Sequence, residues 1–259
     1  RIELIKKINS RINTPKKNYN INIIRDFIKK LPFELTDDQK QATNEIFMDF
    51  KKVTRMNRLL QGDVGSGKTI VSIIASYAIV TAKMQVAILS PTLVLANQHF
   101  DTFKRLLESE GVNVELLTSD ISANNRKKIL EDVTKGDIDI IIGTHSLLNE
   151  ELSFKNLGFV VIDEQQRFGV EQRKIIREKG INPDILMMTA TPIPRTLAIS
   201  IFENTDVSSI KEKPSNRQNI FTKVLDFERV ETAYKRVDEE LRNNNQIYVI
   251  CPLIQENNA

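Results

Sequence analysis

One glycine-rich stretch constrains this chain more than any other feature, because its spacing fits the pattern G-x-x-x-x-G-K-[ST]. Its residues are Gly62, Asp63, Val64, Gly65, Ser66, Gly67, Lys68 and Thr69. The apolar run RLL precedes it and the amphipathic run IVSIIASYAIV follows it. Strand, loop and helix therefore occur in the order that a phosphate-binding loop requires, which favours such a loop over a simple glycine-rich turn.

Each part of a phosphate-binding loop has a chemical role. The glycines allow successive backbone N–H groups to turn towards phosphate oxygens, and the following helix adds the positive end of its dipole. Lys68 would reach the β- and γ-phosphates, and the Thr69 hydroxyl would bind Mg²⁺. The loop therefore predicts a site for a nucleoside triphosphate together with Mg²⁺.

Short runs rich in β-branched residues alternate with longer amphipathic segments from Met84 onward. This alternation is typical of parallel strands joined by helices, and runs that are apolar on both faces are typical of buried parallel strands. The predicted strands are 58–61, 85–90, 112–118, 138–144, 159–163 and 184–189. One connecting helix would bury a stripe made of Leu93, Ala96, Phe100, Phe103 and Leu107. The fold class is therefore α/β, with helices packed against a parallel sheet.

Two acidic residues come at the end of the predicted strand 159–163. A phosphate-binding loop needs a second metal-binding carboxylate at the tip of another strand, and Asp163 meets that need. Asp163 would hold Mg²⁺ through its water shell, while Glu164 would orient or deprotonate the attacking water. An acidic strand-to-helix turn is the alternative, and the presence of the phosphate-binding loop disfavours it.

Two short motifs are candidates for recognising the base of the nucleotide. Residues 134–137 (TKGD) resemble a guanine-reading motif, but residues 126–132 before them are typical of a helix, whereas that motif should end a strand. Adenine recognition by residues 36–39 (TDDQ) is favoured instead. The same four residues also fit a helix capping box. Adenine recognition and capping are equally supported by the spacing, and both can occur at one helix start.

Composition excludes several classes of protein. The 259 residues carry 37 Lys and Arg against 34 Asp and Glu, and the resulting net charge of +3 is too small to indicate nucleic-acid binding by itself. A single cysteine, Cys251, cannot form an internal disulfide. No apolar run reaches the roughly 20 residues of a bilayer span, and the first residues lack a signal-peptide core. We therefore expect a cytoplasmic protein without a membrane segment.

Four segments are expected along the chain. Residues 1–30 form a polar, helical lead-in or connection from an upstream domain, and residues 31–207 form the nucleotide-binding domain. Residues 208–225 read as a linker because they contain KEKPSNRQN. Residues 226–259 offer one helix over 227–244 and one strand over 246–254. These are too few to bury a core, so we expect the truncated beginning of a second domain.

The motifs LPFELTDDQ, RLLQGDVGSGKT, SPTLVLANQH, GTHSLL, VIDEQQRFGVEQR and MTATPIPRTLA stand in the order of the superfamily 2 helicases. Over residues 31–259 the chain resembles the RecG-type branch-migrating DNA helicases. The resemblance implies two RecA-like lobes that bind ATP and Mg²⁺ between them. Residues 31–207 would be the first lobe, and 226–259 would begin the second. Branched or forked DNA would be the partner, and we expect a monomer.

The resemblance also implies roles for individual residues. Gln39 would read adenine with Phe33 nearby, and the glycine-rich loop would hold the triphosphate. Lys68, Asp163, Glu164 and Gln166 would be catalytic, with Thr69 and Asp163 as the Mg²⁺ ligands. The residues that would contact DNA or couple it to the nucleotide are Thr92, Gln98, Thr144, His145, Thr189, Thr191 and Arg195. Thr189 and Thr191 suit relayed hydrogen bonds to Glu164 or Gln166.

The implied function is an ATP-dependent DNA helicase motor lobe that couples ATP hydrolysis to branch migration or fork remodelling in recombination and repair. Two alternatives stay open. One is a transcription-repair coupling translocase, which moves along double-stranded DNA without separating it. The other is a nucleotide- and DNA-binding module without turnover, because the resemblance places an arginine finger on the second lobe. For the same reason we expect the 259-residue chain alone to be nearly inactive.

Overall fold

The computed structural model describes residues 14, 17–191, 205–212, 222–226 and 229–251. The chain divides into two compact units, Arg1–Ser215 and Asn216–Ala259. No helix within the described ranges is long and apolar enough to cross a membrane.

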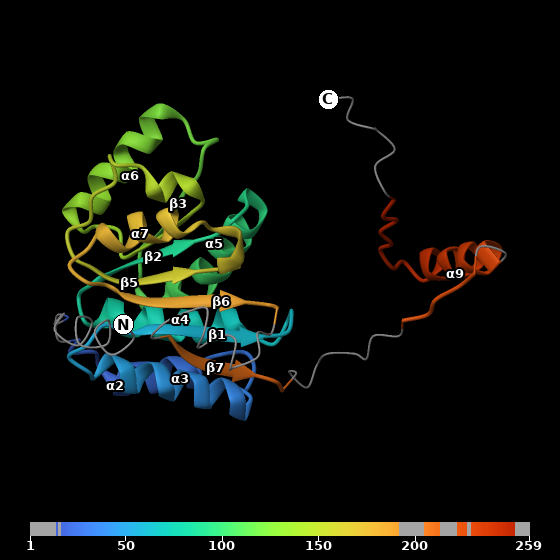
Figure 1. Cartoon of the computed structure of the whole chain (residues 1–259), viewed down its shortest axis with the longest axis horizontal. Coiled ribbons are helices and arrows are strands. Elements are labelled where there is room, and N and C mark those ends of the chain that lie inside the picture. Colours follow the sequence, from blue (N-terminus) through green and yellow to red (C-terminus); the bar gives the residue numbers. More distant parts are fainter. Residues whose placement is uncertain (1–13, 15–16, 192–204, 213–221, 227–228, 252–259) are drawn as a thin grey trace, which may run out of the picture. The chain divides into compact units, whose positions relative to one another are not determined.

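The first unit contains a parallel sheet of seven strands in the order β3-β4-β2-β5-β6-β1-β7 (Figure 1). The strands are β1 (Asn57–Gly62), β2 (Gln85–Leu89), β3 (Val114–Leu117), β4 (Ile140–Gly143), β5 (Leu157–Ile162), β6 (Asp184–Thr189) and β7 (Asp206–Ile210). All six pairings between them are parallel. The α/β class and the six strands predicted from the sequence are confirmed.

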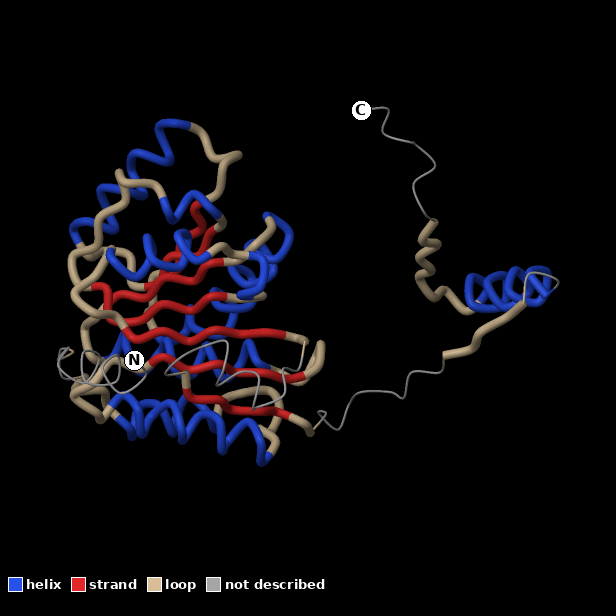
Figure 2. Tube along the Cα trace, viewed as in Figure 1, coloured by secondary structure: helices blue, strands red, loops and turns tan. Residues whose placement is uncertain are grey.

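Helices cover both faces of this sheet, and Figure 2 shows the strands in red as the layer between them. Successive side chains of a strand point to opposite faces, so neighbouring residues enter different cores. Leu60 packs with α2 (Ile21–Lys29), α3 (Asp37–Phe50), α4 (Lys68–Thr81) and α5 (Leu93–Leu107). Leu59 packs with residues of α6 (Ala123–Lys135) and α7 (Val170–Glu178). Because both faces are covered, the inner strands β2, β4, β5 and β6 are buried along their whole length.

Three short 3₁₀ turns join these elements: η1 (Glu108–Glu110), η2 (His145–Leu148) and η3 (Gln165–Arg167). Two of them follow the ends of strands, since η2 comes after β4 and η3 comes after β5. They therefore shape the chain at the edge of the sheet where the predicted site residues lie.

Strand β7 was not predicted from the sequence. It pairs with β1, and three residues of the predicted linker, 208–210, lie within it. The strand was missed because DVSSI has no apolar run and three of its five residues are Asp or Ser, which are typical of turns. Only Ser208 and Ile210 are buried, as expected for an edge strand.

The lead-in joins the same core as the rest of the first unit. Helix α2 buries Ile24 and Phe27, and the Phe27 ring lies 5.0 Å from that of Tyr77 on α4. Just before α2, Lys17 Nζ lies 2.5 Å from Asp184 Oδ2 at the start of β6, with both side chains almost fully buried. The backbone N–H of Met56 also donates to the Asp184 carboxylate at 2.8 Å. Residues 17–29 thus pack as part of the sheet domain.

The second unit contains α9 (Val230–Arg242), which confirms the predicted helix. The strand predicted over 246–254 is wrong for its described part, because 246–251 have no strand structure. Residues 252–254 lie outside the described residues. A strand is stable only when its N–H and C=O groups pair with a neighbour, and no strand is described in this unit.

Replacing Lys17 by Ala should destabilise the first unit by about 3–5 kcal/mol at neutral pH, because it leaves the buried Asp184 carboxylate without its counter-ion. Burial already raises the pKa of Asp184, and the Lys17 cation opposes that rise. Without Lys17 the folded-state pKa rises further above the unfolded value of about 3.9, so the stability of the variant falls as pH increases above about 4. The cost should therefore be smaller at about pH 4.5 than at pH 7.

The measurement is the free energy of unfolding in urea at both pH values. Lys29→Ala is the matched control, because it removes an exposed pair with Asp26 on the same segment and should cost far less. Equal losses in the free energy of unfolding for the two variants would contradict the role of the Lys17–Asp184 pair.

Candidate nucleotide site at the carboxyl edge of the sheet

The predicted site residues meet at one edge because every strand is parallel. Strand β1 ends in the glycine-rich loop, β5 ends before Asp163, and β6 ends at Thr189. In the sheet β6 lies between β5 and β1, so Thr189 sits between the loop and the acidic pair. Ligands of open parallel sheets bind at this edge, beyond the carboxyl ends of the strands.

The glycine-rich loop has the backbone that its sequence predicts. Gly65 and Gly67 have φ values of 76° and 85°, which favour glycine, and α4 begins directly afterwards at Lys68. A Cβ on Gly67 would lie 2.2 Å from Gln39 Nε2, so a side chain there would displace the Gln39 amide. The Ser66 hydroxyl is buried and has no hydrogen-bond partner among the described residues. This loop fits a phosphate group at the start of α4.

Lys68 points back into this loop. Its Nζ donates to the carbonyl oxygens of Gly62 at 2.6 Å and Asp63 at 3.0 Å. Burial lowers the pKa of Lys68, while the charges of Asp163, Glu164 and Asp63 counteract that effect. The side chain is thus a buried cation near carboxylates, where a phosphate oxygen would replace the carbonyl oxygens as acceptor.

A cavity of about 240 Å³ brings the loop and the acidic pair together. It is lined by Val64, Gly65, Lys68, Thr69, Leu95, Gln98, His99, Thr102, Asp163, Glu164 and Ala190. The loop, the tip of β5, the end of β6 and one side of α5 all contribute to it. The sequence placed the loop and the carboxylates in one site, and the structure does bring them together.

The oxygen donors of this cavity fit Mg²⁺. Thr69 supplies a hydroxyl and Asp163 a carboxylate, which are the hard ligands that this ion prefers. No group of three or more His, Cys, Asp or Glu side chains that could hold a metal occurs in the part of the chain that the structure describes. Mg²⁺ is commonly held by one or two protein groups together with phosphate oxygens and water, so the small number of ligands suits this ion.

Asp163 is held from two directions. Its backbone N–H donates to the Leu89 carbonyl at 2.9 Å, which continues the pairing of β5 with β2. Its Oδ2 lies 2.8 Å from His99 Nε2 of α5, and both residues are buried. The sequence did not predict this contact. The position of His99 between Ala96 and Phe103 on the buried stripe of α5 could have indicated that the ring is buried, but not that it contacts Asp163.

Glu164 has an unusual backbone. Its φ and ψ of 45° and 53° are left-handed, which for a residue with a side chain costs about 1–2 kcal/mol. Gln166 Nε2 donates to Glu164 Oε2 at 2.5 Å, and Thr189 Oγ1 donates to Gln166 Oε1 at 3.3 Å. Thr189 Oγ1 lies 2.9 Å from Thr191 Oγ1. Hydrogen bonds thus run from these threonines to Gln166 and on to Glu164, the two residues to which a relay was predicted.

Gln39 has the capping role that its sequence context allowed, and it also contacts the glycine-rich loop. It completes a capping box, in which Thr36 N donates to Gln39 Oε1 at 3.0 Å and Gln39 N donates to Thr36 Oγ1 at 3.3 Å. Its Nε2 also donates to the Ser66 carbonyl at 2.8 Å. Gln39 thus ties the start of α3 to the glycine-rich loop, and its contact with adenine stays a prediction.

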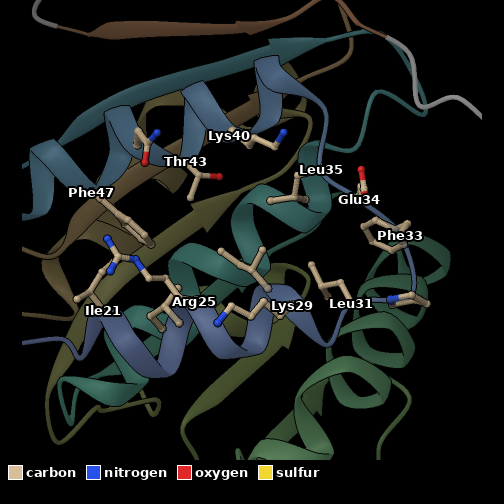
Figure 3. Close-up of a pocket in the computed structure, with 14 residues that line it drawn as sticks. Ile21, Arg25, Lys29, Leu31, Phe33, Glu34, Leu35, Lys40, Thr43 and Phe47 are labelled. Atoms are coloured by element: carbon tan, nitrogen blue, oxygen red, sulfur yellow. The ribbon is translucent and has the colours of Figure 1, made fainter.

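Phe33 lies apart from the phosphate end of the site. It is 46% exposed and lines a hollow of about 800 Å³ between α2 and α3, to which no residue of the glycine-rich loop contributes. Figure 3 shows it on the loop before α3, beside Leu31, Glu34 and Leu35, with Lys40, Thr43 and Phe47 from α3 and Ile21, Arg25 and Lys29 from α2.

The residues predicted to contact DNA are spread over the same edge. Thr92 caps α5 by accepting from Leu95 N at 3.3 Å, and it is exposed. Thr144 precedes η2, and the exposed His145 ring lies 5.5 Å from that of Phe168. Gln98 differs from the others, because it lines the cavity with Lys68 and Asp163. Arg195 lies outside the described residues.

Comparison with known proteins gives consistent matches. The DEAD/DEAH box helicase family model matches residues 36–199. RecG of Aquifex aeolicus (strain VF5), named as an ATP-dependent DNA helicase, is 49% identical over 244 residues, which are 93% of this chain and 31% of that protein. RecG of Staphylococcus epidermidis (strain RP62A) is 51% identical over 238 residues, which are 92% of this chain and 35% of that protein. The chain spans about a third of the length of these relatives.

Solved structures agree. The structure of RecG bound to a three-way DNA junction has a TM-score of 0.83 and 38% identity, and covers 98% of this chain and 34% of that one. The helicase MrfA has a TM-score of 0.63 at 18% identity over 93% of this chain and 39% of that one, which shows the fold alone. The parallel sheet is thus the RecA-like fold of helicases. The family model covers more than half of the sequence, and the chain belongs to the DEAD/DEAH box helicase family.

Proposed function

We propose that this chain is the ATP-binding lobe of a RecG-type DNA helicase, which couples ATP hydrolysis to branch migration or fork remodelling in recombination and repair. The observation that carries the proposal is the cavity in which Lys68, Asp163 and Glu164 meet. The identity of about half to RecG proteins favours this function over a coupling translocase.

The chain's own residues would act as follows. The glycine-rich loop and Lys68 would bind the β- and γ-phosphates, and Thr69 and Asp163 would hold Mg²⁺. When bound, Mg²⁺ would neutralise charge on the phosphate oxygens. Glu164 would orient the attacking water and accept its proton, and the hydrogen bond from Gln166 would hold the Glu164 carboxylate for that task. Gln39, with Phe33 nearby, would read adenine.

The same relay would link ATP to DNA. Glu164, Gln166 and Thr189 are connected by hydrogen bonds, and Thr191 extends them to the surface. We assign phosphate contacts with DNA to Thr92, Thr144, His145 and Arg195, and a further contact to Gln98. Such contacts fix position and carry no sequence information. The solved RecG complex with a three-way junction supports branched DNA as the partner.

Residues 226–259 would begin a second RecA-like lobe. Helix α9 is amphipathic, yet it buries no residue, and Tyr234 and Leu241 are 67% and 54% exposed. Apolar residues on one side of a helix normally pack against another element. This exposure supports the assignment of α9 to a larger domain.

Lys68→Ala should weaken binding of the triphosphate by roughly 10–100-fold, because one charge-assisted hydrogen bond contributes about 1.5–3 kcal/mol. Adenosine should bind nearly as before, since Lys68 would contact only phosphate. Titration of both ligands tests this, with Lys127→Ala on the exposed side of α6 as the control. An unchanged triphosphate affinity would remove the basis of the proposal.

Gly67→Ala should also lose triphosphate binding, because the new Cβ would displace the Gln39 amide from the loop. Gly111→Ala is a matched control, since Gly111 has a φ of 72° and nothing lies within 4 Å of its added Cβ. Both variants strain the backbone by about 1–2 kcal/mol, but only Gly67→Ala changes the loop. Thermal unfolding and nucleotide titration separate these effects. Similar affinities for the two variants would contradict the loop geometry.

Glu164→Gln in the complete motor should leave nucleotide affinity nearly normal and slow hydrolysis by about 10²–10⁴-fold, because an amide cannot accept the proton of the attacking water. Single-turnover hydrolysis measures the chemical step directly. Glu171→Gln in the first turn of α7 is the control and should hydrolyse at the wild-type rate. If Glu164→Gln did the same, the base would have to be another residue.

A further inference from the structure

A buried histidine outside the predicted site touches the metal-binding carboxylate. His99 Nε2 lies 2.8 Å from Asp163 Oδ2, and each residue is 7% exposed. His99 belongs to α5, whereas Asp163 follows β5, so the contact joins two elements 64 residues apart in the sequence. Among the residues that line the cavity, these two are thus directly connected.

The chemistry of this contact determines which nitrogen of the His99 ring carries a proton. An ionised carboxylate only accepts hydrogen bonds, so the Nε2 atom of His99 must carry the proton. The bond uses one acceptor position of Asp163 Oδ2 and leaves Oδ1 for the shell of a metal ion. Groups that bind a metal-holding side chain in this way set its orientation, and their loss typically costs 10–100-fold in metal affinity.

Packing holds the imidazole ring in place. The His99 ring lies edge-on to the Phe103 ring, with centroids 6.4 Å apart and an interplanar angle of 76°. Phe103 is fully buried in the core formed with α4 and the sheet. The ring therefore has a fixed direction, and any displacement of α5 would move the Nε2 donor relative to Asp163.

The outer side of α5 carries other proposed functions. Its N-cap, Thr92, is exposed at the strand edge, and Gln98 precedes His99 and lines the same cavity. Under the proposed function, this helix would meet DNA at its start and the nucleotide site along one side. One helix would then contact both ligands of the motor.

We propose that His99 is a positioning residue, which holds the Asp163 carboxylate for Mg²⁺ and thereby joins α5 to the metal site. This inference rests on the proposed function. It differs from a purely structural role, in which His99 would serve only to satisfy a buried carboxylate. A structural role predicts a loss of stability alone, whereas positioning predicts a change in the Mg²⁺ dependence of nucleotide binding.

Two variants separate shape from hydrogen bonding. His99→Phe keeps a ring against Phe103 but has no donor, whereas His99→Gln loses the ring and keeps an N–H at a similar distance from the backbone. His99→Ala is a third variant that leaves space for water beside Asp163. The control is Asn97→Ala, because Asn97 is exposed on the same helix and bonds only to its own turn.

The measurement is binding of fluorescent methylanthraniloyl-ADP to the full-length protein, titrated with MgCl₂ and repeated in EDTA. We expect His99→Phe and His99→Ala to need roughly tenfold or more additional Mg²⁺ for the same gain in affinity, with unchanged affinity in EDTA. His99→Gln should stay within about threefold of the wild type, and Asn97→Ala should match it.

Two results would overturn the inference. One is an Mg²⁺ dependence of nucleotide binding in His99→Phe or His99→Ala that matches the wild type. The other is an equal loss of nucleotide affinity for His99→Gln and His99→Phe that also appears in EDTA. That pattern would reflect altered folding. If the wild type bound no nucleotide, with or without Mg²⁺, the proposed function itself would fail, and this outcome is distinct from the first two.

Discussion

The parallel pairing of β5, β6 and β1 is the constraint on which the site depends. Ile162 pairs with Met187, and Gln61 pairs with Thr189, so the ends of the three strands lie at nearly the same level. A slip of one residue in either register would turn each side chain of a strand to the opposite face, and the close packing of both cores opposes this. The cores on the two faces thus determine how close Asp163 comes to the glycine-rich loop.

The packed sheet holds a strained backbone at Glu164, directly after the end of β5. The left-handed backbone at Glu164 lets the chain turn sharply after Asp163, so that the adjacent carboxylates could serve the two different tasks proposed for them. Asp163 is tied down by Leu89 and His99, whereas Glu164 is partly exposed and is held by Gln166. A rigid carboxylate suits a metal ion, and a more accessible one suits a water molecule.

The features found from the sequence are those encoded by neighbouring residues. Short runs rich in β-branched residues predicted the strands, and the glycine-rich loop could be recognised because a strand precedes it and a helix follows it. Strand β7 was missed because an edge strand needs little apolar surface, and the strand over 246–251 was wrongly predicted because composition does not reveal a missing partner. The His99–Asp163 contact depends on β2 lying beside β5, which no local pattern states.

Gln39 shows why the two interpretations of its motif could not be separated by sequence. Its amide has two acceptor positions and two donor hydrogens. The capping box uses Oε1 once, through Thr36 N, and the bond to Ser66 uses one hydrogen of Nε2. One acceptor position and one hydrogen are not needed for these bonds, and an adenine edge requires one of each. Capping α3 therefore does not compete with reading a base. Because the same amide touches Ser66, an adenine contact would act on the backbone of the phosphate loop without any further element.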